Sequence, residues 1–449
     1  MSTQVVILNG AGSGDDRLEK PLSLLVSLLE QARADVRCYH LKDIPLAHCS
    51  GCFGCWIKTP GRCVVADQGR EILRDIINSD TLILFTPVTF GGYSSTLKLM
   101  VDRFIPMVSP FFILRHGEIH HLPRYRRYPR LIGIGLTPRK DRLTGEIFQA
   151  LVGRNAVNML VPSFAAGVLE ADADQDTLSR QMRELISRSD PWPPENLNTF
   201  FPKVDDTLTG PAGGKGRALL IVGSPKINQR STSAILGEYV LGKMAAAGWE
   251  TGTLTLKADL KRESGQKKLR AAAGQADLII LAFPLYVDAL PFLVTKALEV
   301  LADQRPTDAD TPRRLFTIIN NGFPEYQQNA LALAICRNFA DQCGFTWAGA
   351  LALGAGEALG GETDLHMKNR MGLSRSHIRR ALGTAGSRLA ENRPVLFSVQ
   401  EQMGKTPLPL MPFGLWRRIF IWVGSLWWLK KASKNGLKKR DLVAAPHGD

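Results

Sequence analysis

The sequence predicts an α/β protein with two domains, each built on a parallel sheet with helices on both faces. Three features favour this fold class. The chain has 449 residues, which is too long for one ordinary core. Short apolar runs alternate with segments whose apolar residues recur at three-to-four spacing, as in strand–helix units. A stretch rich in proline and glycine interrupts this alternation, which then starts again.

The first half alternates between apolar runs and helical patterns. Thr81–Thr86 is apolar without alternation, which is typical of a strand covered on both faces. The expected strands are Val5–Asn9, Val36–Leu41, Thr81–Thr86, Leu131–Leu136 and Met159–Phe164. Helical spacing is found at Leu18–Leu29, Ile72–Ile77, Leu97–Phe104, after Thr144 and at Leu178–Ile186.

Between Asp190 and Gly216 the chain is rich in proline and glycine, which predicts a linker. The alternation then resumes with a helix at Ser231–Ala247. The expected strands of this half are Ala218–Val222, Thr251–Leu256, Asp277–Phe283 and Leu315–Ile319. We therefore predict a first domain at 1–190, a linker at 191–216, a second domain at 217–395 and a basic aromatic tail at 396–449.

The two halves can be aligned on each other. The first strand ends at Gly10 in one half and at Gly223 in the other, and the third ends at Pro87 and Pro284. These intervals are 77 and 61 residues, and their difference of 16 is about the size of a cysteine-rich segment that only the first half contains. We interpret this as a tandem duplication.

The formal net charge of +14 suggests anionic partners, and much of the excess follows Arg393. No helix-turn-helix, RNP or zinc-finger spacing accompanies it, so we predict no nucleic-acid partner. The N-terminus lacks the basic and apolar regions of a secretory signal, which favours a cytoplasmic location.

Four of the seven cysteines lie in one short segment, which we call the cysteine loop: Cys49, Cys52, Cys55 and Cys63. Such clustering indicates a metal, an iron–sulfur cluster, a redox pair or a disulfide framework. A reducing compartment weakens the disulfide interpretation.

A second candidate site lies between a strand and a helix, from Gly223 to Ser233. Backbone amides at a helix N-terminus, together with Ser and Thr hydroxyls, suit a phosphate group. The simpler alternative is that Ser231 or Thr232 only caps the helix. That alternative does not explain Gly-Ser-Pro followed by three hydroxyl residues in a row.

The pattern of Gly223-Ser224-Pro225, Ser231-Thr232-Ser233 and the segment Pro284–Pro291 resembles the flavodoxin-like NAD(P)H-dependent FMN reductases. The first half resembles them through Thr86–Ser94. The resemblance implies five-stranded parallel sheets of order 2-1-3-4-5, with FMN across the carboxyl ends of the strands and NAD(P)H as co-substrate.

The resemblance also implies site residues. Those expected to hold the phosphate are Ser224, Lys226, Ser231, Thr232 and Ser233. Those expected beside the flavin ring are Pro284, Leu285, Tyr286, Val287, Asn321 and Gly322 in the second copy, and Pro87, Val88, Phe90 and Gly91 in the first. The first loop of copy one carries Asp15 and Asp16, whose charges would repel a phosphate, so the second copy is favoured for FMN.

The spacing Cys-x2-Cys-x2-Cys-x7-Cys is similar to that of the iron–sulfur flavoproteins of the same superfamily. This resemblance implies a 4Fe–4S cluster held by Cys49, Cys52, Cys55 and Cys63. Two alternatives stay open: a structural zinc site, and free or redox-active thiols.

The C-terminal tail combines an aromatic and apolar stretch, Pro412–Leu429, with lysines and an arginine after it. Arg417 and Arg418 interrupt it, and it is too short to span a bilayer, which takes about 20 apolar residues. We expect either an interfacial helix in peripheral contact with the inner face of the membrane or a helix packed on the domain or on a partner subunit.

Three functions are compatible with these patterns. The first is an NAD(P)H-dependent FMN oxidoreductase that passes electrons to a flavin, a quinone or a small organic acceptor. The second is an electron-transfer module that works with a redox partner protein. The third is a non-redox flavodoxin-like scaffold. No catalytic acid–base residue is predicted, and the chain either forms a homo-oligomer or mimics a dimer within one polypeptide.

Overall fold

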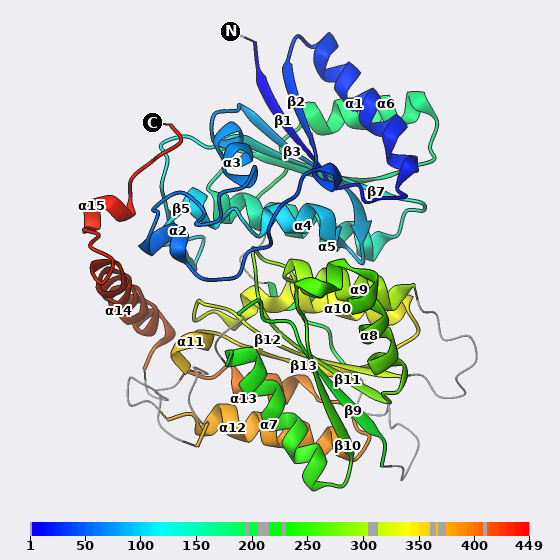
Figure 1. The fold of residues 1–449 in the computed structure, drawn as a ribbon, viewed down its shortest axis with the longest axis vertical. Coiled ribbons are helices and arrows are strands. Elements are labelled where there is room, and N and C mark those ends of the chain that lie inside the picture. The colour runs from blue at the N-terminus through cyan, green and yellow to red at the C-terminus, as the bar shows by residue number, and fades with distance from the viewer. Residues whose placement is uncertain are drawn as a thin grey trace. The chain divides into compact units, whose positions relative to one another are not determined.

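The computed structural model describes residues 2–193, 197–204, 215–226, 230–303, 313–359, 365–366, 374–406 and 411–448. The chain forms two compact units (Figure 1). Unit 1 contains Met1–Glu195 and Ile421–Asp449, and unit 2 contains Asn196–Phe420. Each unit has its own parallel sheet, as the sequence predicts.

The main sheet of unit 1 has strand order β2-β1-β3-β7-β8, which is 2-1-3-4-5 in chain order. Its strands are β1 (Gln4–Asn9), β2 (Asp35–His40), β3 (Thr81–Thr89), β7 (Arg130–Thr137) and β8 (Phe164–Glu170). All four pairings between them are parallel. The two-residue strand β4 (Gly92–Tyr93) turns back and pairs antiparallel with the end of β3. The predicted fold class is confirmed.

Helices cover both faces of this sheet (Figure 1). One face packs on α1 (Glu19–Gln31) and α6 (Gln175–Ser187), whose leucines join the strand residues in one core cluster. The other face carries α3 (Gly69–Ile77), α4 (Ser95–Val101) and α5 (Arg142–Met159). Short 3-10 turns lie at Asp16–Leu18 (η1), Leu41–Asp43 (η2) and Ile105–Met107 (η3).

Unit 1 also holds two features outside the doubly wound pattern. The cysteine loop contains the short helix α2 (Gly54–Ile57). A hairpin of β5 (Val108–Arg115) and β6 (Glu118–Pro123) lies between α4 and β7. Our sequence analysis did not predict this hairpin, although His116-Gly117, both at positive φ, marks its turn.

The sheet of unit 2 has the order β10-β9-β11-β12-β13, again 2-1-3-4-5. Its strands are β9 (Arg217–Val222), β10 (Glu250–Thr255), β11 (Leu278–Pro284), β12 (Arg314–Asn320) and β13 (Thr346–Leu353). All pairings are parallel. The switch point, where neighbouring connections leave in opposite directions, lies between β9 and β11, and ligands bind at such points in open α/β sheets.

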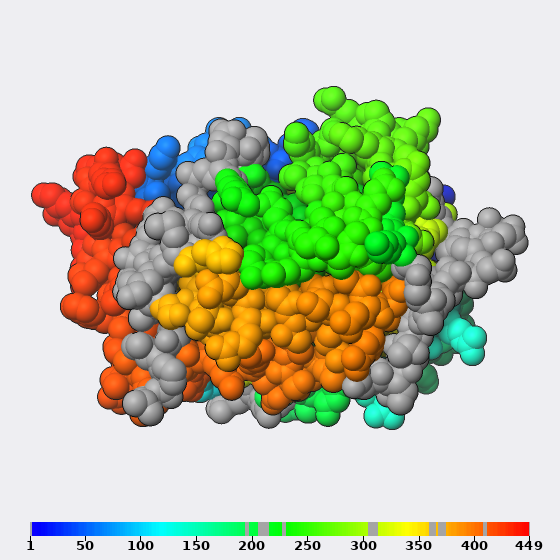
Figure 2. Space-filling view, turned by 90° about the horizontal axis from the view of Figure 1, so that it is seen from below, coloured from blue at the N-terminus to red at the C-terminus, as the bar shows by residue number. Residues whose placement is uncertain are grey.

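One face of this sheet packs on α7 (Thr232–Ala246), α12 (Ser376–Ala390) and α13 (Phe397–Met403). Figure 2 shows α7 in green beside α12 in orange, and Gly386 of α12 lies so close to Lys243 of α7 that a Cβ would clash. The other face carries α8 (Glu263–Gly274), α9 (Phe292–Ala302) and α10 (Ala330–Gln342) (Figure 1). The short pieces are η4 (Leu197–Phe200), η5 (Ala258–Lys261), η6 (Tyr326–Asn329) and α11 (Gly356–Leu359).

The structure corrects one predicted strand. Met159–Phe164 is not a strand, because α5 continues to Met159 and β8 begins only at Phe164. Leu160 adopts a left-handed conformation that ends the helix, which an apolar run does not reveal.

The segment predicted as a linker, 191–216, is structured in part. It contains η4, in which Leu197 is fully buried, and Phe201 packs against Tyr326 and Phe397. Two apolar side chains anchor this stretch to unit 2 despite the prolines around it. Residues 194–196 and 205–214 of the predicted linker lie outside the described residues.

The predicted tail, 396–449, does not form one separate piece. Its first part includes α13, which packs on β13 and α12 of unit 2. Its last part, from Ile421, belongs to unit 1. The helix α14 (Phe413–Ser433) and the short helix α15 (Lys439–Leu442) lie in this region. Among the described residues, no helix combines the length and apolar character needed to cross a bilayer.

We expect Ser94→Ala to lower the stability of unit 1 by about 2 kcal/mol. The buried Ser94 hydroxyl donates to the Gly10 carbonyl at 2.6 Å and accepts from the Leu97 amide at 3.1 Å, so it ties the first loop to the start of α4. Its loss leaves buried groups without these partners. Denaturant unfolding measures the change. The control is Asp174→Ala at the exposed cap of α6, which accepts from the Thr177 amide and should cost about 1 kcal/mol or less. Equal effects of the two variants would contradict this account.

Candidate functional site

The loops at the carboxyl edge of the unit 2 sheet bring most of the predicted FMN-site residues together. β9 ends at Val222, and Ser224 and Pro225 follow as buried residues. Ser231 is the N-cap of α7 and accepts a hydrogen bond from the Ala234 amide at 3.2 Å. The helix therefore begins with the amides of Thr232 and Ser233 at its free end. Residues 227–229 of the loop lie outside the described residues.

Side-chain hydrogen bonds join this loop to the ends of β12 and β13. The Ser233 hydroxyl donates to the Asn320 side-chain oxygen at 2.7 Å, and the Thr232 hydroxyl donates to the Gly356 carbonyl at 3.4 Å. Lys226 Nζ lies 3.0 Å from Glu357 Oε1. Asn320 and Glu357 are not among the predicted site residues, although Asn320 directly precedes the predicted Asn321-Gly322.

The predicted ring-side residues lie on the neighbouring strand ends. Tyr286 pairs with Ala289 through two backbone hydrogen bonds, and the residues between them, Val287 and Asp288, both have positive φ. The Leu285 amide donates to the Asn320 carbonyl at 2.8 Å, which ties the end of β11 to β12. Pro284 to Val287 are partly exposed. This tight turn therefore presents its edge at the switch point of the sheet.

The loop after β12 lies beside the same turn. The Asn321 amide donates to the Leu353 carbonyl at 3.0 Å and the Gly356 amide donates to the Asn321 carbonyl at 2.8 Å. Gly322 is exposed, and a Cβ added there would meet no atom within 4 Å.

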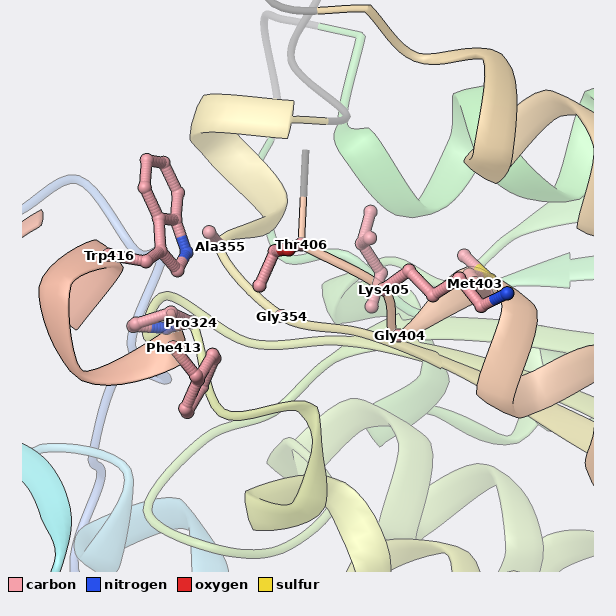
Figure 3. A pocket seen from close by; sticks show the side chains of 10 residues that line it. Pro324, Gly354, Ala355, Met403, Gly404, Lys405, Thr406, Phe413 and Trp416 are labelled. Atoms are coloured by element: carbon pink, nitrogen blue, oxygen red, sulfur yellow. The ribbon is translucent and has the colours of Figure 1, made fainter. Parts of the chain in front are cut away.

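A hollow of about 280 Å³, part of it open solvent, lies next to these loops (Figure 3). It is lined by Pro324, Leu353, Gly354, Ala355, Met403, Gly404, Lys405, Thr406, Phe413 and Trp416. Among the described lining residues, Lys405 is the charged one. The hollow adjoins the ends of strands four and five, while the predicted phosphate residues lie at strand one.

The donor set of unit 2 fits FMN. Amides at the start of α7, four hydroxyl residues and Lys226 are the groups that a phosphate accepts hydrogen bonds from. Thr232, Ser233 and Lys226 contact a carbonyl, an amide and a carboxylate oxygen of the chain, which a phosphate would replace. Bound FMN supplies the hydride and electron chemistry that these side chains lack.

The corresponding loop of unit 1 has a different chemistry. The Gly12 amide donates to the Asp15 carboxylate at 2.6 Å, and the Ala11 amide donates to the Asn9 side chain at 3.0 Å. The chain's own carboxylate therefore stands where a phosphate would be bound. The ring-side segment keeps its shape, because Phe90 and Gly91 have positive φ and form the turn between β3 and β4. Gly91 packs so closely on Ile147 that a Cβ would clash, while Pro87 and Val88 are partly exposed.

The four cysteines of the loop lie near one another in unit 1. Cys52 is exposed, and Cys49, Cys55 and Cys63 are partly buried. Burial raises the pKa of the Cys49 thiol to about 12, and charges on Asp102, Cys63 and Cys52 add to the rise. Burial likewise raises the pKa of the Cys55 thiol, with further contributions from Cys49, Cys63 and Cys52.

Two buried arginines accompany the cysteines. Burial opposes the charge of Arg103, but its hydrogen bond to Asp67 and its interaction with the Cys63 thiol outweigh this, so its pKa is raised. Arg124 lies near Cys55 and donates to the carbonyls of Pro106 and Val108 at 2.8 and 3.2 Å. Arg103 comes shortly after the end of α4, and Arg124 directly follows β6. The spacing of the cysteines alone does not predict that these arginines lie near the cysteine loop.

The donor set suits a soft metal group. Close thiols are poor thiolates by themselves and become good ligands when a bound cation neutralises them. Among the described residues, no three His, Cys, Asp or Glu side chains are gathered closely enough to hold a single metal ion. The four thiols are thus suitable ligands by residue type, but their side chains do not form a closed single-metal site in this structure.

Aromatic side chains cover the cysteine loop. Trp56 is buried and stacks on Phe53 with ring centroids 5.2 Å apart, and its indole nitrogen donates to the Val108 carbonyl at 2.9 Å. His121 packs on Trp56 at 4.6 Å, and burial lowers the pKa of His121 to about 3, so the ring is neutral at neutral pH. Trp428 of α14 meets Trp56 edge-on at 4.9 Å and Phe53 at 5.2 Å.

The rest of the C-terminal segment also binds to this part of unit 1. We call residues 421–448 the C-terminal strap; it passes α2 and β5 (Figure 1). Its carbonyls at Ala444, Pro446 and His447 accept hydrogen bonds at 2.6, 3.3 and 2.8 Å. The donors are Arg124, Arg62 and Asn78. Ala432 and Leu442 are buried against Phe111. The strap is thus part of the surroundings of the cysteine loop.

We expect Trp428→Ala to increase the alkylation rate of Cys55 by roughly tenfold, because two aromatic contacts that hold the strap down are lost. The measurement is mass-spectrometric mapping of labelled thiols after metal removal under reducing conditions. Trp422→Ala, on the exposed face of the same helix, is the matched control and should label like the wild type. Identical labelling of Cys55 in all three proteins would show that the strap does not shield the loop.

Comparison with known proteins concerns unit 1, which carries the cysteine loop. Residues 3–114, which run from β1 into β5 and include the cysteine loop and the ring-side turn, match the family of NADPH-dependent FMN reductases. This match supports a flavin oxidoreductase that uses FMN. It lies in unit 1, and not in the unit that the phosphate-loop argument favours.

Individual relatives point to the same class. An iron–sulfur flavoprotein of Methanocaldococcus jannaschii is 35% identical over 99 residues, which are 21% of this chain and 50% of the relative. An iron–sulfur flavoprotein of Archaeoglobus fulgidus is 31% identical over 87 residues, 19% of this chain and 39% of the relative. The chain spans about half the length, or less, of the curated relatives it matches.

Among solved structures, the NAD(P)H:quinone oxidoreductase of Methanothermobacter marburgensis has 14% sequence identity and a TM-score of 0.29. The likeness covers 39% of this chain and 96% of the other. A similarity of this size carries no argument about function, and the fold itself is evident from the two sheets.

Proposed function

We propose that the protein is an FMN oxidoreductase that takes electrons from NAD(P)H and passes them to a flavin, a quinone or another small organic acceptor. The observation that carries the proposal is the match of residues 3–114 to the FMN reductase family. With a quinone, NAD(P)H and one proton would give NAD(P)⁺ and the hydroquinone, so two electrons are transferred. Hydride transfer of this kind needs no acid–base side chain in the protein.

We place the FMN phosphate in unit 2, at Ser224, Lys226, Ser231, Thr232 and Ser233. The exposed side of the loop after β12 and the turn at Tyr286 would hold the ring. Two observations support unit 2 over unit 1. Its loop offers hydroxyls and a lysine, whereas the unit 1 loop already has the Asp15 carboxylate on its amide. This carboxylate would repel the negative charge of a phosphate.

We further propose that the two units arose by tandem duplication. Both sheets have the order 2-1-3-4-5, and in both a tight turn with two residues at positive φ follows the third strand. These turns are Phe90-Gly91 and Val287-Asp288. On this view the cysteine loop and the hairpin of β5 and β6 are additions to unit 1 alone.

We propose that Cys49, Cys52, Cys55 and Cys63 hold a 4Fe–4S cluster. The named relatives are iron–sulfur flavoproteins, the four thiols lie in one short loop, and Arg103 and Arg124 interact electrostatically with Cys63 and Cys55. A cluster bound here would supply one-electron transfer. The protein's part would be to hold it with thiolates, to offset its negative charge with the two arginines and to limit water with Trp56 and Trp428.

The same loop favours a second candidate function, that of an electron-transfer protein that receives electrons from a protein donor. Steady-state assays with NADPH or NADH and a soluble quinone separate the two. Turnover that scales with bound FMN supports the oxidoreductase. Protein that carries FMN but shows no turnover with either nicotinamide, while a ferredoxin-type donor reduces it, supports the second function instead.

A further inference from the structure

The helix α14 has two faces of different character. Along one face Trp416, Trp428 and Ala432 are buried, and Phe420 and Gly424 between them are half-buried. The opposite face exposes large apolar side chains, at Leu415 (49% exposed), Trp422 (66%) and Leu426 (47%). Residues four apart lie on one face of a helix, so Arg418, Trp422, Leu426 and Lys430 form one continuous exposed stripe.

The protein itself occupies the inner face. Trp428 packs on Phe53 and Trp56, and a Cβ on Gly424 would lie 2.7 Å from the Phe112 ring. The helix is thus held in place by its buried side, and this docking sets the direction in which Trp422 points. Apolar exposure of this size on a side chain as large as tryptophan is costly in water, which suggests that this face has a partner.

The charge around the exposed stripe has one sign. From Phe413 to Arg440 the chain contains eight basic residues and no Asp or Glu. The exposed ones are Arg418, Lys430, Lys434, Lys438, Lys439 and Arg440. The partner should therefore combine an apolar layer with negative charge beside it.

We propose that the outer face of α14 docks the protein on the surface of a bilayer that contains anionic lipids. Trp422, Leu415 and Leu426 would enter the boundary between headgroups and acyl chains, and the lysines would lie against the anionic headgroups. A second copy of the chain fits less well. A symmetric contact through this face would bring the exposed basic residues of one protomer near those of the other.

The test is flotation of the full-length protein with lipid vesicles at low and high salt. We expect the protein to float with vesicles that contain phosphatidylglycerol, to float much less with phosphatidylcholine alone, and to be released by high salt. Trp422→Ser should weaken binding roughly tenfold or more. Lys430→Glu combined with Lys434→Glu should abolish the preference for anionic vesicles.

The matched control is Leu143→Ser, which removes a leucine that is 45% exposed on α5, to be compared with Leu426→Ser. Circular dichroism checks that all variants stay folded. Absence of flotation at low salt, or equal binding of Leu143→Ser and Leu426→Ser, overturns the proposal. A third contrary outcome is a protein that does not bind vesicles but forms a concentration-dependent dimer, which Trp422→Ser dissociates. That result would identify a second copy of the chain as the partner. None of these readouts depends on a bound cofactor.

Discussion

Replacing Cys55 with serine is expected to abolish iron and acid-labile sulfide in the purified protein, from about four irons per chain to near zero. Cys55 lies in α2, behind Trp56 and within electrostatic reach of the other three thiols of the loop. A serine hydroxyl is a hard and weakly acidic ligand, and three remaining thiolates leave one iron of the proposed cluster without its sulfur ligand. The loss should therefore concern the whole cluster.

The control for this variant is Cys343→Ser. Cys343 is partly buried at the end of α10 in unit 2 and lies outside the cysteine loop. Iron and sulfide should stay at the wild-type level in this variant. Protein purified without oxygen that contains zinc and no sulfide would indicate the zinc alternative. Wild-type protein with neither metal would leave free thiols as the explanation of the loop.

Ser231→Asp is expected to lower FMN affinity by about 100-fold or more, while α7 stays as stable as in the wild type. Asp and Ser are equally good N-caps, so the hydrogen bond from the Ala234 amide can be kept. The new carboxylate stands at the helix start, where the phosphate dianion is proposed to bind, and like charges about 4 Å apart repel by about 4 kcal/mol at an effective dielectric constant of about 20. Flavin content after purification and FMN titration of the apoprotein measure the change.

Two further variants show which unit holds the flavin. Asp174→Ser makes the reverse exchange at the N-cap of α6 and should leave FMN content unchanged. Asp15→Asn removes the carboxylate that the Gly12 amide binds in unit 1. If FMN binds unit 2, the Asp15→Asn variant should also keep the wild-type flavin content. A gain of FMN in Asp15→Asn, together with full FMN content in Ser231→Asp, would move the site to unit 1.

The fold was predictable because its signals are local. The apolar run Thr81–Thr86 lies within β3, and the apolar run at Asp277–Phe283 corresponds to β11, because strands buried on both faces need uninterrupted apolar residues. The glycines at the first strand ends also mark real loops, since a Cβ on Gly10 would lie 2.5 Å from Leu97. The end of a helix that depends on one left-handed residue, such as Leu160 after α5, could not be predicted from the sequence.

The surroundings of the candidate sites were less predictable, because their contacts join distant parts of the chain. Arg62 bonds to the Pro446 carbonyl across 384 positions, and Ser233 bonds to Asn320 across 87. No spacing rule connects such residues. The hairpin of β5 and β6 was missed for another reason. Its two strands are short and carry no regular alternation of polar and apolar residues, so only His116-Gly117 marks the turn in the sequence.

The exposure of individual side chains in the C-terminal tail was also not predictable from the sequence. Its aromatic and basic composition predicts an amphipathic helix, and α14 is a helix of 21 residues. Which of its tryptophans is buried depends on what the inner face meets. Trp428 is covered by Phe53 and Trp56, and Trp422 is exposed. That difference separates a contact within unit 1 from the surface that we propose for lipid binding.

The central claim is that this protein carries a flavin that nicotinamide reduces. The most direct measurement is an anaerobic titration of the full-length protein with NADPH, and separately with NADH, followed by visible absorption. We predict a flavin spectrum that bleaches upon addition of about one equivalent of NADPH or NADH, because a hydride carries both electrons that FMN accepts. Colourless protein that releases no flavin on denaturation, or bound flavin that neither nicotinamide bleaches, would contradict it.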